Sequence, residues 1–182
     1  RQVIQRHQPG PAVANLSTSR MIDHVAKEAG VDVHRSPVGE ANVAAAMKRL
    51  GAILGGEGNG GVIWPPIAYV RDSLATMALV LEMVAGEGRT VADLADDLPT
   101  YTIVKEKVQI TPGMADRAID ALATRFAEAR QDRPDGIRID TDAGWLHVRP
   151  SNTEPILRII AEAADETAAG ELIDAARNAI NG

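Results

Sequence analysis

The sequence predicts two domains, an α/β layered domain followed by an α+β domain with an antiparallel sheet. In the first half, short apolar segments alternate with helical patterns, as in strands covered by helices. In the second half, longer alternating segments are joined by short turns, as in hairpins. Between the halves, Leu98-Pro99-Thr100 ends a helical pattern, and proline restricts the residue before it. We therefore expect domains at residues 1–98 and 99–182.

Composition narrows the functional classes. The chain has 182 residues and a formal net charge of −6, which disfavours a nucleic-acid partner because phosphate backbones require a basic face. It has no cysteine, so disulfides and thiolate metal sites are excluded. No apolar run reaches membrane-spanning length, and no secretion signal is visible, so we expect a cytoplasmic protein without a membrane partner. The start at Arg1, without a methionine, suggests a piece of a longer protein.

The first half begins with alternating strands and helices. We expect strands at residues 12–16, 31–34 and 52–54. Helical spacing of Met21, Ile22, Val25, Ala26 and Ala29 predicts a helix before Gly30, and Val43, Met47 and Leu50 predict a second helix before Gly51. Gly51 suits the position just after a helix, where a left-handed backbone is common.

Two further helices are expected before the domain boundary. Asp72 or Ser73 can cap a long helix that ends at Gly86. A short helix follows at residues 90–98, with Thr90 and Asp93 spaced as a capping box. The apolar stripe of the long helix consists of Leu74, Met77, Ala78, Leu81 and Val84.

The second half predicts an antiparallel sheet with two helices over one face. Strands are expected at residues 101–110, 136–140, 145–149 and 156–162, with a hairpin turn at residues 141–144. Thr111 and Pro112 suit the cap and first position of a helix. The apolar faces of the two helices are Ala115, Ala118, Ile119, Leu122 and Phe126 in the first, and Leu172, Ile173, Ala176 and Ile180 in the second.

A glycine-dense segment at residues 55–61 is the first candidate site. Its glycines formally match a dinucleotide-binding fingerprint, but that fingerprint requires a helix directly afterwards, and here a strand and two prolines follow. The segment presents two functional side chains, Glu57 and Asn59. A carboxylate and a carboxamide on a flexible backbone suit sugar hydroxyls. The alternative is an ordinary surface turn.

The second candidate site is the segment RPSNTEP at residues 149–155. Two prolines bracket it, so its backbone enters and leaves in few conformations. Such a loop can direct Arg149, Ser151, Asn152 and Thr153 at one anion, because a guanidinium fork and hydroxyl and amide donors suit phosphate oxygens. The alternative is a turn that only joins two strands.

These two segments resemble motifs of the α-D-phosphohexomutases, the superfamily of phosphoglucomutase, phosphomannomutase and phosphoglucosamine mutase. Residues 149–163 resemble the phosphate-binding loop and the strand after it, residues 55–61 the sugar-binding loop, and residues 35–40 a third signature of that family's second half. The resemblance implies sugar binding by Glu57 and Asn59, with Glu40 at a position where many members have a polar group near the substrate. It implies phosphate binding by Arg149, Ser151, Asn152 and Thr153. Many members have histidine at the position of Gly61, so one polar contact is missing.

The resemblance covers a partial third domain and a last domain with a sheet like that of TATA-binding protein. It implies the C-terminal fragment of an enzyme of carbohydrate metabolism, an isomerase and phosphotransferase that interconverts hexose 1- and 6-phosphates through a bisphosphate. The family's phosphoserine loop and its aspartate-rich Mg²⁺ loop do not occur in this sequence. We therefore expect no catalytic or metal-binding residue here, an inactive fragment, and missing N-terminal domains as partners alongside the hexose phosphate and bisphosphate. Glucose, mannose and glucosamine are the candidate hexoses.

One alternative comes from a different functional class. The second half alone could be a non-catalytic phosphate- or anion-binding regulatory module, whose binding would not depend on the Glu57 loop.

The four histidines have no paired spacing, so we expect structural or solvent-facing roles for His7, His24, His34 and His147.

Overall fold

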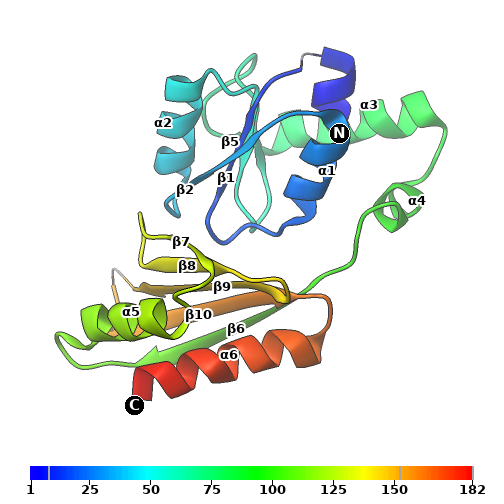
Figure 1. Ribbon diagram of the computed structural model, residues 1–182. Helices are drawn as coiled ribbons and strands as arrows, with labels where there is room; N and C mark the ends of the chain where they lie inside the picture. Colours follow the sequence, from blue (N-terminus) through cyan, green and yellow to red (C-terminus); the bar gives the residue numbers. More distant parts are fainter. Residues whose placement is uncertain (8, 152, 182) are drawn as a thin grey trace. The chain divides into compact units, whose positions relative to one another are not determined.

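The computed structural model describes residues 1–7, 9–151 and 153–181 and contains two compact units (Figure 1). The first unit comprises Arg1–Pro99, and the second unit comprises Thr100–Gly182. Each unit has its own sheet and its own apolar core. Among the described residues, no helix combines the length and apolar character that crossing a membrane requires.

The first unit is an α/β layered fold on a mixed five-stranded sheet of order β2-β1-β3-β4-β5. Strand β1 is parallel to β2 and β3, whereas β4 is antiparallel to β3 and β5. Its elements are η1 (Val3–His7), β1 (Ala12–Asn15), α1 (Met21–Ala29), β2 (Val33–Ser36), α2 (Glu40–Leu50), β3 (Leu54–Gly56), β4 (Val62–Ile63), β5 (Arg71–Asp72), α3 (Ser73–Glu87) and α4 (Val91–Asp96).

Helices cover both faces of this sheet (Figure 1). On one face, Val43 and Met47 of α2 pack against Val13 of β1. On the other face, η1 and α3 contribute to a second cluster that contains Val3 and Leu79. The two clusters use alternate sides of the strands, which is the arrangement expected when side chains alternate across a sheet.

Local signals in the sequence explain most helix ends. Helices α1 and α2 end at Gly30 and Gly51 as predicted, and both glycines adopt the left-handed conformation, with φ of 66° and 62°. Thr90 and Asp93 form both bonds of the predicted capping box at the start of α4. Asp72 caps α3 by accepting a hydrogen bond from the backbone N–H of Ala75 at 2.8 Å.

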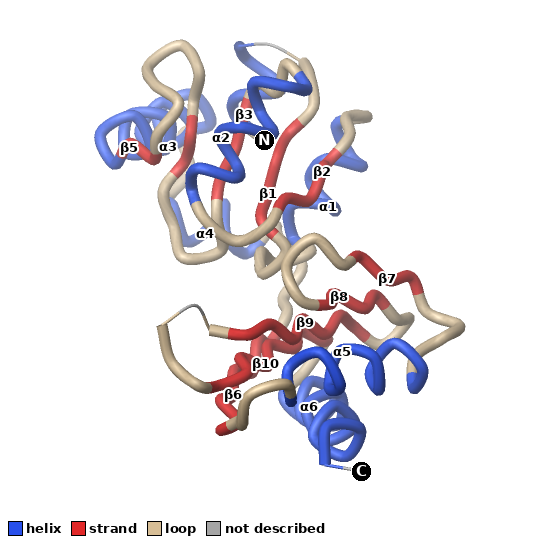
Figure 2. The backbone as a smooth tube through the Cα atoms, turned by 90° about the vertical axis from the view of Figure 1, so that its left-hand side faces the viewer, coloured by secondary structure: helices blue, strands red, loops and turns tan. Residues whose placement is uncertain are grey.

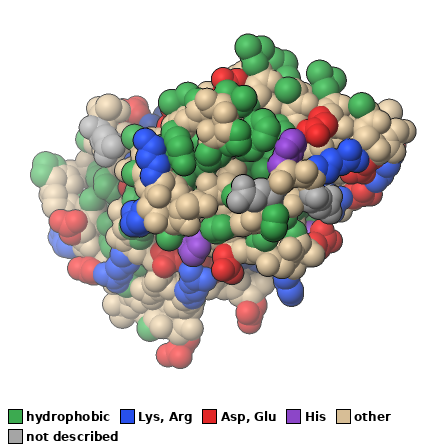
Figure 3. Space-filling view, turned by 90° about the horizontal axis from the view of Figure 1, so that it is seen from above, with side chains coloured by type: hydrophobic (Ala, Val, Ile, Leu, Met, Phe, Trp, Pro, Cys, Tyr) green, Lys and Arg blue, Asp and Glu red, His purple; other side chains and the backbone are tan. Residues whose placement is uncertain are grey.

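Helix α3 departs from its prediction in two ways. It ends at Glu87, with Gly88 at the left-handed position, and not at Gly86. Its predicted apolar stripe also does not form its buried face, because Leu74, Met77 and Leu81 are 74%, 52% and 66% exposed. The residues of α3 that are buried are Ala75 and Leu79. Hydrophobic side chains are therefore exposed on the first unit (Figure 3).

The second unit is an α+β fold on an antiparallel sheet of order β6-β10-β9-β8-β7. Helices α5 and α6 lie on the same face of this sheet (Figures 1 and 2), and the core forms between them and the strands. The elements are β6 (Thr102–Gln109), α5 (Met114–Arg125), β7 (Arg130–Asp132), β8 (Ile137–Asp140), β9 (Gly144–Pro150), β10 (Ile156–Ala163) and α6 (Glu166–Asn181).

Some predicted details of the elements are wrong or incomplete. Helix α5 is not capped by Thr111 with Pro112 at its first position. It begins at Met114 after Gly113, whose φ of 78° is accessible to glycine at little cost. The short elements η1, β5 and β7 were not predicted, and β2 and β3 begin two residues later than expected.

The sheet face opposite α5 and α6 carries polar and aromatic side chains. The indole Nε1 of Trp145 donates a hydrogen bond to Oε1 of Glu162 at 2.8 Å. The guanidinium of Arg138 lies 4.4 Å from the centre of the Trp145 ring. His147 and Arg149 follow at alternate positions of the same strand and therefore share this face.

Candidate functional site

The Glu57 loop lies at the carboxyl ends of the parallel strands of the first unit. Asn15 ends β1, Gly39 and Glu40 follow β2, and Glu57 follows β3. Because β1, β2 and β3 are parallel, these residues meet at one edge of the sheet. This edge is where ligands bind in open α/β folds.

Glu57 is a fixed and nearly buried carboxylate. Its side chain is 5% exposed. Its Oε1 accepts hydrogen bonds from Nδ2 of Asn15 at 2.8 Å and from the backbone N–H of Gly39 at 2.9 Å. Asn15 is itself held, because its Oδ1 accepts from the backbone N–H of Ser17 at 3.0 Å and from Oγ1 of Thr18 at 2.8 Å. The carboxylate is therefore oriented before any ligand arrives.

Arg71 joins the three predicted sugar-side residues. Its Nε donates to Oε2 of Glu40 at 2.8 Å, and its Nη1 donates to Oδ1 of Asn59 at 2.9 Å. The same Nη1 lies 3.5 Å from Oε2 of Glu57. The hydrogen bond from Arg71 lowers the pKa of Glu40, and Glu40 in turn raises the pKa of Arg71.

An open depression of about 410 Å³ lies over this cluster and is lined by Glu40, Asn59, Gly60, Gly61, Arg71 and Ser73. Gly61 has a φ of 81°, and a Cβ atom there would lie 3.1 Å from Cβ of Arg71. The stem of Arg71 therefore packs against the position at which the resemblance marks a missing polar contact. The structure brings Glu40, Glu57 and Asn59 together around one cation.

The phosphate-loop candidate is the connection between β9 and β10. Arg149 lies near the end of β9 and faces Arg158 of β10 directly across the ladder, and Arg158 faces Lys107 of β6 in the same way. Residues paired across antiparallel strands lie on the same side of the sheet, so three cationic side chains form one row. Like charges opposed in this manner repel, and a bound anion would offset that repulsion.

Acidic neighbours orient two members of this row. Nε of Arg149 donates to Oδ2 of Asp135 at 2.9 Å, and Nη2 of Arg158 donates to Oε2 of Glu154 at 3.2 Å. The Arg149 side chain is only 14% exposed, so its position is well constrained. Within the described residues, no hydrogen bond uses its two terminal nitrogens, which form the fork that suits phosphate oxygens.

Gly136 explains how Asp135 reaches Arg149. Gly136 has a φ of 69°, and a Cβ atom there would lie 2.2 Å from the carbonyl oxygen of Val148 and 2.7 Å from Cα of Arg149. Only glycine lets this turn approach β9 so closely. The approach also brings the carbonyl oxygen of Asp135 within 2.8 Å of Nε2 of His147, which donates to it.

The polar side chains of the loop have fewer contacts. The backbone N–H of Ser151 donates to the carbonyl oxygen of Ile156 at 2.9 Å and closes the base of the loop. The backbone N–H of Thr153 lies 3.5 Å from Oγ of Ser151. Thr153 is exposed and Ser151 is half-buried. Asn152, the remaining predicted phosphate ligand, lies outside the described residues.

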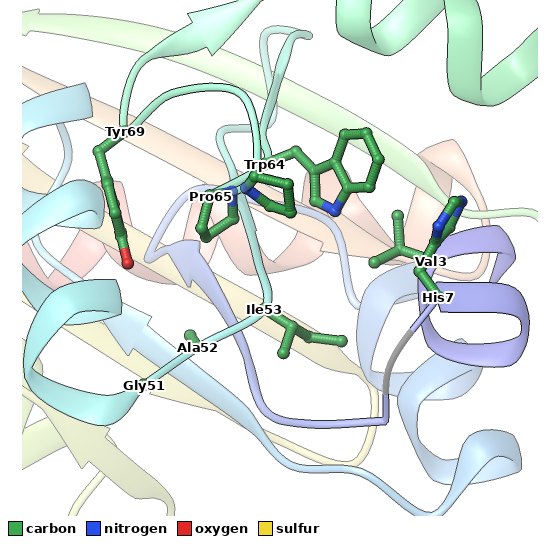
Figure 4. Close-up of a pocket in the computed structure, with 9 residues that line it drawn as sticks. Val3, His7, Gly51, Ala52, Ile53, Trp64, Pro65 and Tyr69 are labelled. Atoms are coloured by element: carbon green, nitrogen blue, oxygen red, sulfur yellow. The ribbon is translucent and has the colours of Figure 1, made fainter.

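A separate depression of about 690 Å³ occurs in the first unit. Trp64, Pro65 and Tyr69 lie along one side of it, with Ile53 below and His7 at one end (Figure 4). It contains none of the predicted site residues. Within the described ranges, acidic and histidine side chains form no group of three or more that could hold a metal ion.

Both units match known domains of one family. Residues 1–101 match phosphoglucomutase/phosphomannomutase, alpha/beta/alpha domain III, and residues 104–179 match the C-terminal domain of the same family. The chain belongs to the phosphoglucomutase/phosphomannomutase family. The layered first unit and the antiparallel sheet of the second unit are the folds of its third and fourth domains.

Similar proteins include a probable phosphoglucosamine mutase of Methanopyrus kandleri, 36% identical over 96% of this chain and 39% of that protein. A solved phosphoglucomutase/phosphomannomutase family protein from Burkholderia thailandensis is 26% identical, with a TM-score of 0.81 over 99% of this chain and 39% of its own. An N-acetylphosphoglucosamine mutase of Aspergillus fumigatus, solved with GlcNAc-6P and magnesium, shares the fold at 17% identity and a TM-score of 0.66. The chain spans about two fifths of the length of these mutases.

The mutase motifs alone did not reveal three residues that contact the predicted ligands, Asn15, Arg71 and Asp135. Asn15 ends a strand that was predicted, and a polar residue at a strand's carboxyl end was a usable signal. Arg71 contacts residues 12 and 31 positions away, and Asp135 contacts a residue 14 positions away. Those contacts depend on the pairing of the two-residue strands β4 and β5 and on the turn before β8.

Proposed function

We propose that this chain is the C-terminal, substrate-binding part of a hexose-phosphate mutase, an enzyme that interconverts hexose 1- and 6-phosphates through a bisphosphate. The observation that carries the proposal is the row of opposed cations at the β9–β10 loop, in which Nε of Arg149 is held by Asp135 and, among the described residues, no hydrogen bond uses its terminal nitrogens. Family membership and the names of its relatives support the reaction class.

In this proposal Arg149, Ser151, Asn152 and Thr153 bind the phosphate that does not react. Arg149 supplies two parallel N–H donors, and each charge-assisted hydrogen bond is worth about 1.5–3 kcal/mol. Lys107 and Arg158 add positive charge on the same side of the sheet. These groups do no chemistry themselves. They lower the barrier by holding the ester in one orientation.

Glu57, Asn59 and Glu40 bind the sugar hydroxyls. Two hydrogen bonds occupy Oε1 of Glu57, so its Oε2 is the oxygen that accepts from a hydroxyl. Asn59 turns its carbonyl oxygen toward Arg71, so its Nδ2 is the group that donates. Donor and acceptor side by side match the vicinal hydroxyls of a hexose such as glucose, mannose or glucosamine.

The reacting groups belong to the remaining domains of the longer protein. We assign the metal and the phosphoserine to those domains, because the family's aspartate-rich Mg²⁺ loop and its phosphoserine loop do not occur in this sequence. The isolated chain is therefore expected to bind ligand without turnover. Its partners are the hexose phosphate, the hexose bisphosphate and the N-terminal domains of the same polypeptide.

Calorimetric titration of glucose 1-phosphate and of inorganic phosphate into this chain tests the proposal. Replacing Arg149 by alanine should weaken both ligands about 10- to 100-fold, because one or two charge-assisted bonds are lost. Glu57→Gln should weaken glucose 1-phosphate and leave inorganic phosphate unchanged. Arg133→Ala is the matched control, since Arg133 pairs with Asp120 in the same unit. Equal binding by the Arg149 and Arg133 variants would exclude the phosphate role.

The second candidate is a non-catalytic phosphate-binding regulatory module, which the cationic row of the second unit also supports. It predicts that the sugar contributes nothing, so glucose 1-phosphate and inorganic phosphate would bind equally well. Glu57→Gln would then change neither affinity.

A further inference from the structure

We propose that Arg71 is the positioning residue of the sugar loop, the part of the glycine-dense segment at residues 57–61 that carries Glu57 and Asn59, and that it sets which polar atoms this loop offers to the hexose. The inference rests on the proposed function and specifies how that site is organised. Arg71 lies outside the two loop motifs and was found only through its contacts.

One guanidinium contacts all three sugar-side residues. Glu40 belongs to the first turn of α2, whereas Glu57 and Asn59 follow β3. Arg71 hydrogen-bonds Glu40 and Asn59, and it lies 3.5 Å from both Oε2 of Glu57 and the carbonyl oxygen of Gly60. A planar fork can satisfy several acceptors at fixed angles, which the single ammonium of lysine cannot.

The backbone of Arg71 is anchored where the loop ends. Arg71 pairs with Ile63 in the β4–β5 ladder, and β4 begins immediately after Gly61. The Arg71 side chain therefore runs back along the loop from a hydrogen-bonded strand. Its stem occupies the space beside Gly61, where a Cβ atom would lie 3.1 Å and 3.2 Å from Cβ and Cδ of Arg71.

Arg71 also determines the polarity of the ligand-facing atoms. With Oδ1 of Asn59 bound to the guanidinium, Nδ2 of Asn59 is available to donate to a hydroxyl oxygen. The positive charge balances one of the two carboxylates of Glu40 and Glu57, so the cluster keeps one net negative charge. Without Arg71, the two carboxylates would repel each other and the carboxamide could rotate.

The first test measures loop order in the 182-residue chain without ligand. Arg71→Gln should raise amide hydrogen exchange of residues 57–61 by about tenfold or more, because the restraint on the loop is lost. Arg89→Gln is the matched control, since Arg89 also pairs with a carboxylate, Asp97, and a backbone carbonyl in the same unit. Loop exchange equal in the two variants would overturn the proposal.

The second test separates positioning from charge alone. Arg71→Lys keeps the charge beside Glu40, so the pKa of Glu40 measured by NMR should stay low, but the contact with Asn59 is lost. We expect loop exchange in Arg71→Lys close to that of Arg71→Gln. Full restoration of slow exchange by lysine would show that charge alone suffices and would overturn the positioning role.

Ligand titration distinguishes failure of this inference from failure of the proposed function. Arg71→Gln should weaken glucose 1-phosphate about tenfold and leave inorganic phosphate unchanged. A wild-type chain that does not prefer glucose 1-phosphate to phosphate would refute the proposed function, and loop exchange would still decide the role of Arg71. A wild-type preference that Arg71→Gln leaves intact would refute the inference alone.

Discussion

His147 is a buried histidine two residues before Arg149, and its neutral form is the one that suits the fold. Burial lowers its pKa from 6.5 to about 4, and the hydrogen bond from its Nε2 to the carbonyl oxygen of Asp135 opposes this shift only in part. The unfolded chain therefore binds a proton between pH 6.5 and pH 4 that the folded chain does not. The contribution of neutral His147 to the free energy of unfolding is therefore complete above pH 6.5 and is lost as the pH falls toward 4.

We expect the free energy of unfolding to fall by up to about 1.4 kcal/mol per pH unit across this window because of His147. Carboxyl groups whose pKa is lowered, such as Glu40, also stabilise the fold, but that stabilisation is lost only below pH 4.5. Between pH 4.5 and 6.5 they therefore do not contribute to the slope. Urea unfolding at a series of pH values measures the slope. His147→Gln should reduce that slope by up to about 1.4 kcal/mol per pH unit between pH 4.5 and 6.5, because the unfolded chain no longer takes up this proton. An NMR titration that gives His147 a pKa near 6.5 would contradict this account.

Asp135 accepts a hydrogen bond from Nε of Arg149, and its negative charge also opposes a bound phosphate. Asp135→Asn keeps an acceptor for Nε of Arg149 but removes the charge. We expect phosphate to bind this variant at least as tightly as the wild type, whereas Asp135→Ala should weaken binding because Arg149 loses its partner. Calorimetry of inorganic phosphate with both variants gives the comparison. Equal affinities for the asparagine and alanine variants would show that the hydrogen bond does not position Arg149.

The turn that connects β7 to β8 is the element on which the phosphate-loop geometry depends. Gly136→Ala should destabilise the second unit by at least about 2 kcal/mol, because the new Cβ atom would meet the backbone of β9 and the residue has a positive φ. Gly170→Ala is the matched control. Gly170 lies within α6 and a Cβ atom there meets nothing within 4 Å, so alanine should be neutral or stabilising by up to about 1 kcal/mol. Thermal unfolding of both variants tests the difference, and similar melting temperatures would contradict it.

At this scale, the sequence was most informative where a local signal is decisive. Gly30 and Gly51 end helices because few other residues tolerate their backbone angles, and the Thr90–Asp93 capping box needs only residues three positions apart. The start of α5 was misjudged because Thr111-Pro112 satisfies the capping pattern, yet Gly113 can turn the chain and take the cap position. Strands β5 and β7 span two and three residues, which is too short for a periodic pattern. Their existence depends on partners distant in sequence.

The same limit applies to the site as a whole. Glu57, Asn59 and Arg149 are predicted as ligands because they belong to contiguous motifs and their residue types fit sugar hydroxyls and phosphate. Arg71 and Asp135 reach those residues only after β4 pairs with β5 and β8 pairs with β9. Tertiary pairing, and not local pattern, therefore decides the partners that orient the predicted ligands.

The exposed face of α3 bears on the molecule as a whole. Leu74, Met77 and Leu81 recur at helical spacing on this face, while Ala75 and Leu79 face the sheet, so the helix is apolar on both sides. A helix that is apolar all round is normally buried all round. The mutases that this chain resembles are about two and a half times as long. If this chain is the C-terminal part of such a mutase, we expect the remaining domains to cover this face.

A single introduced thiol tests that expectation, because the chain has no cysteine. Met77→Cys should react rapidly with a maleimide in the 182-residue chain and about tenfold or more slowly in the longer polypeptide, where the face would be covered. Asp174→Cys is the control, since Asp174 is 71% exposed on α6 and should react rapidly in both proteins. Equal reactivity of the Met77→Cys variant in both proteins would show that the face stays open. Slow reaction already in the short chain would place a second copy or the chain's own second unit on it, and dilution would separate these two, because only protection by a second copy depends on concentration.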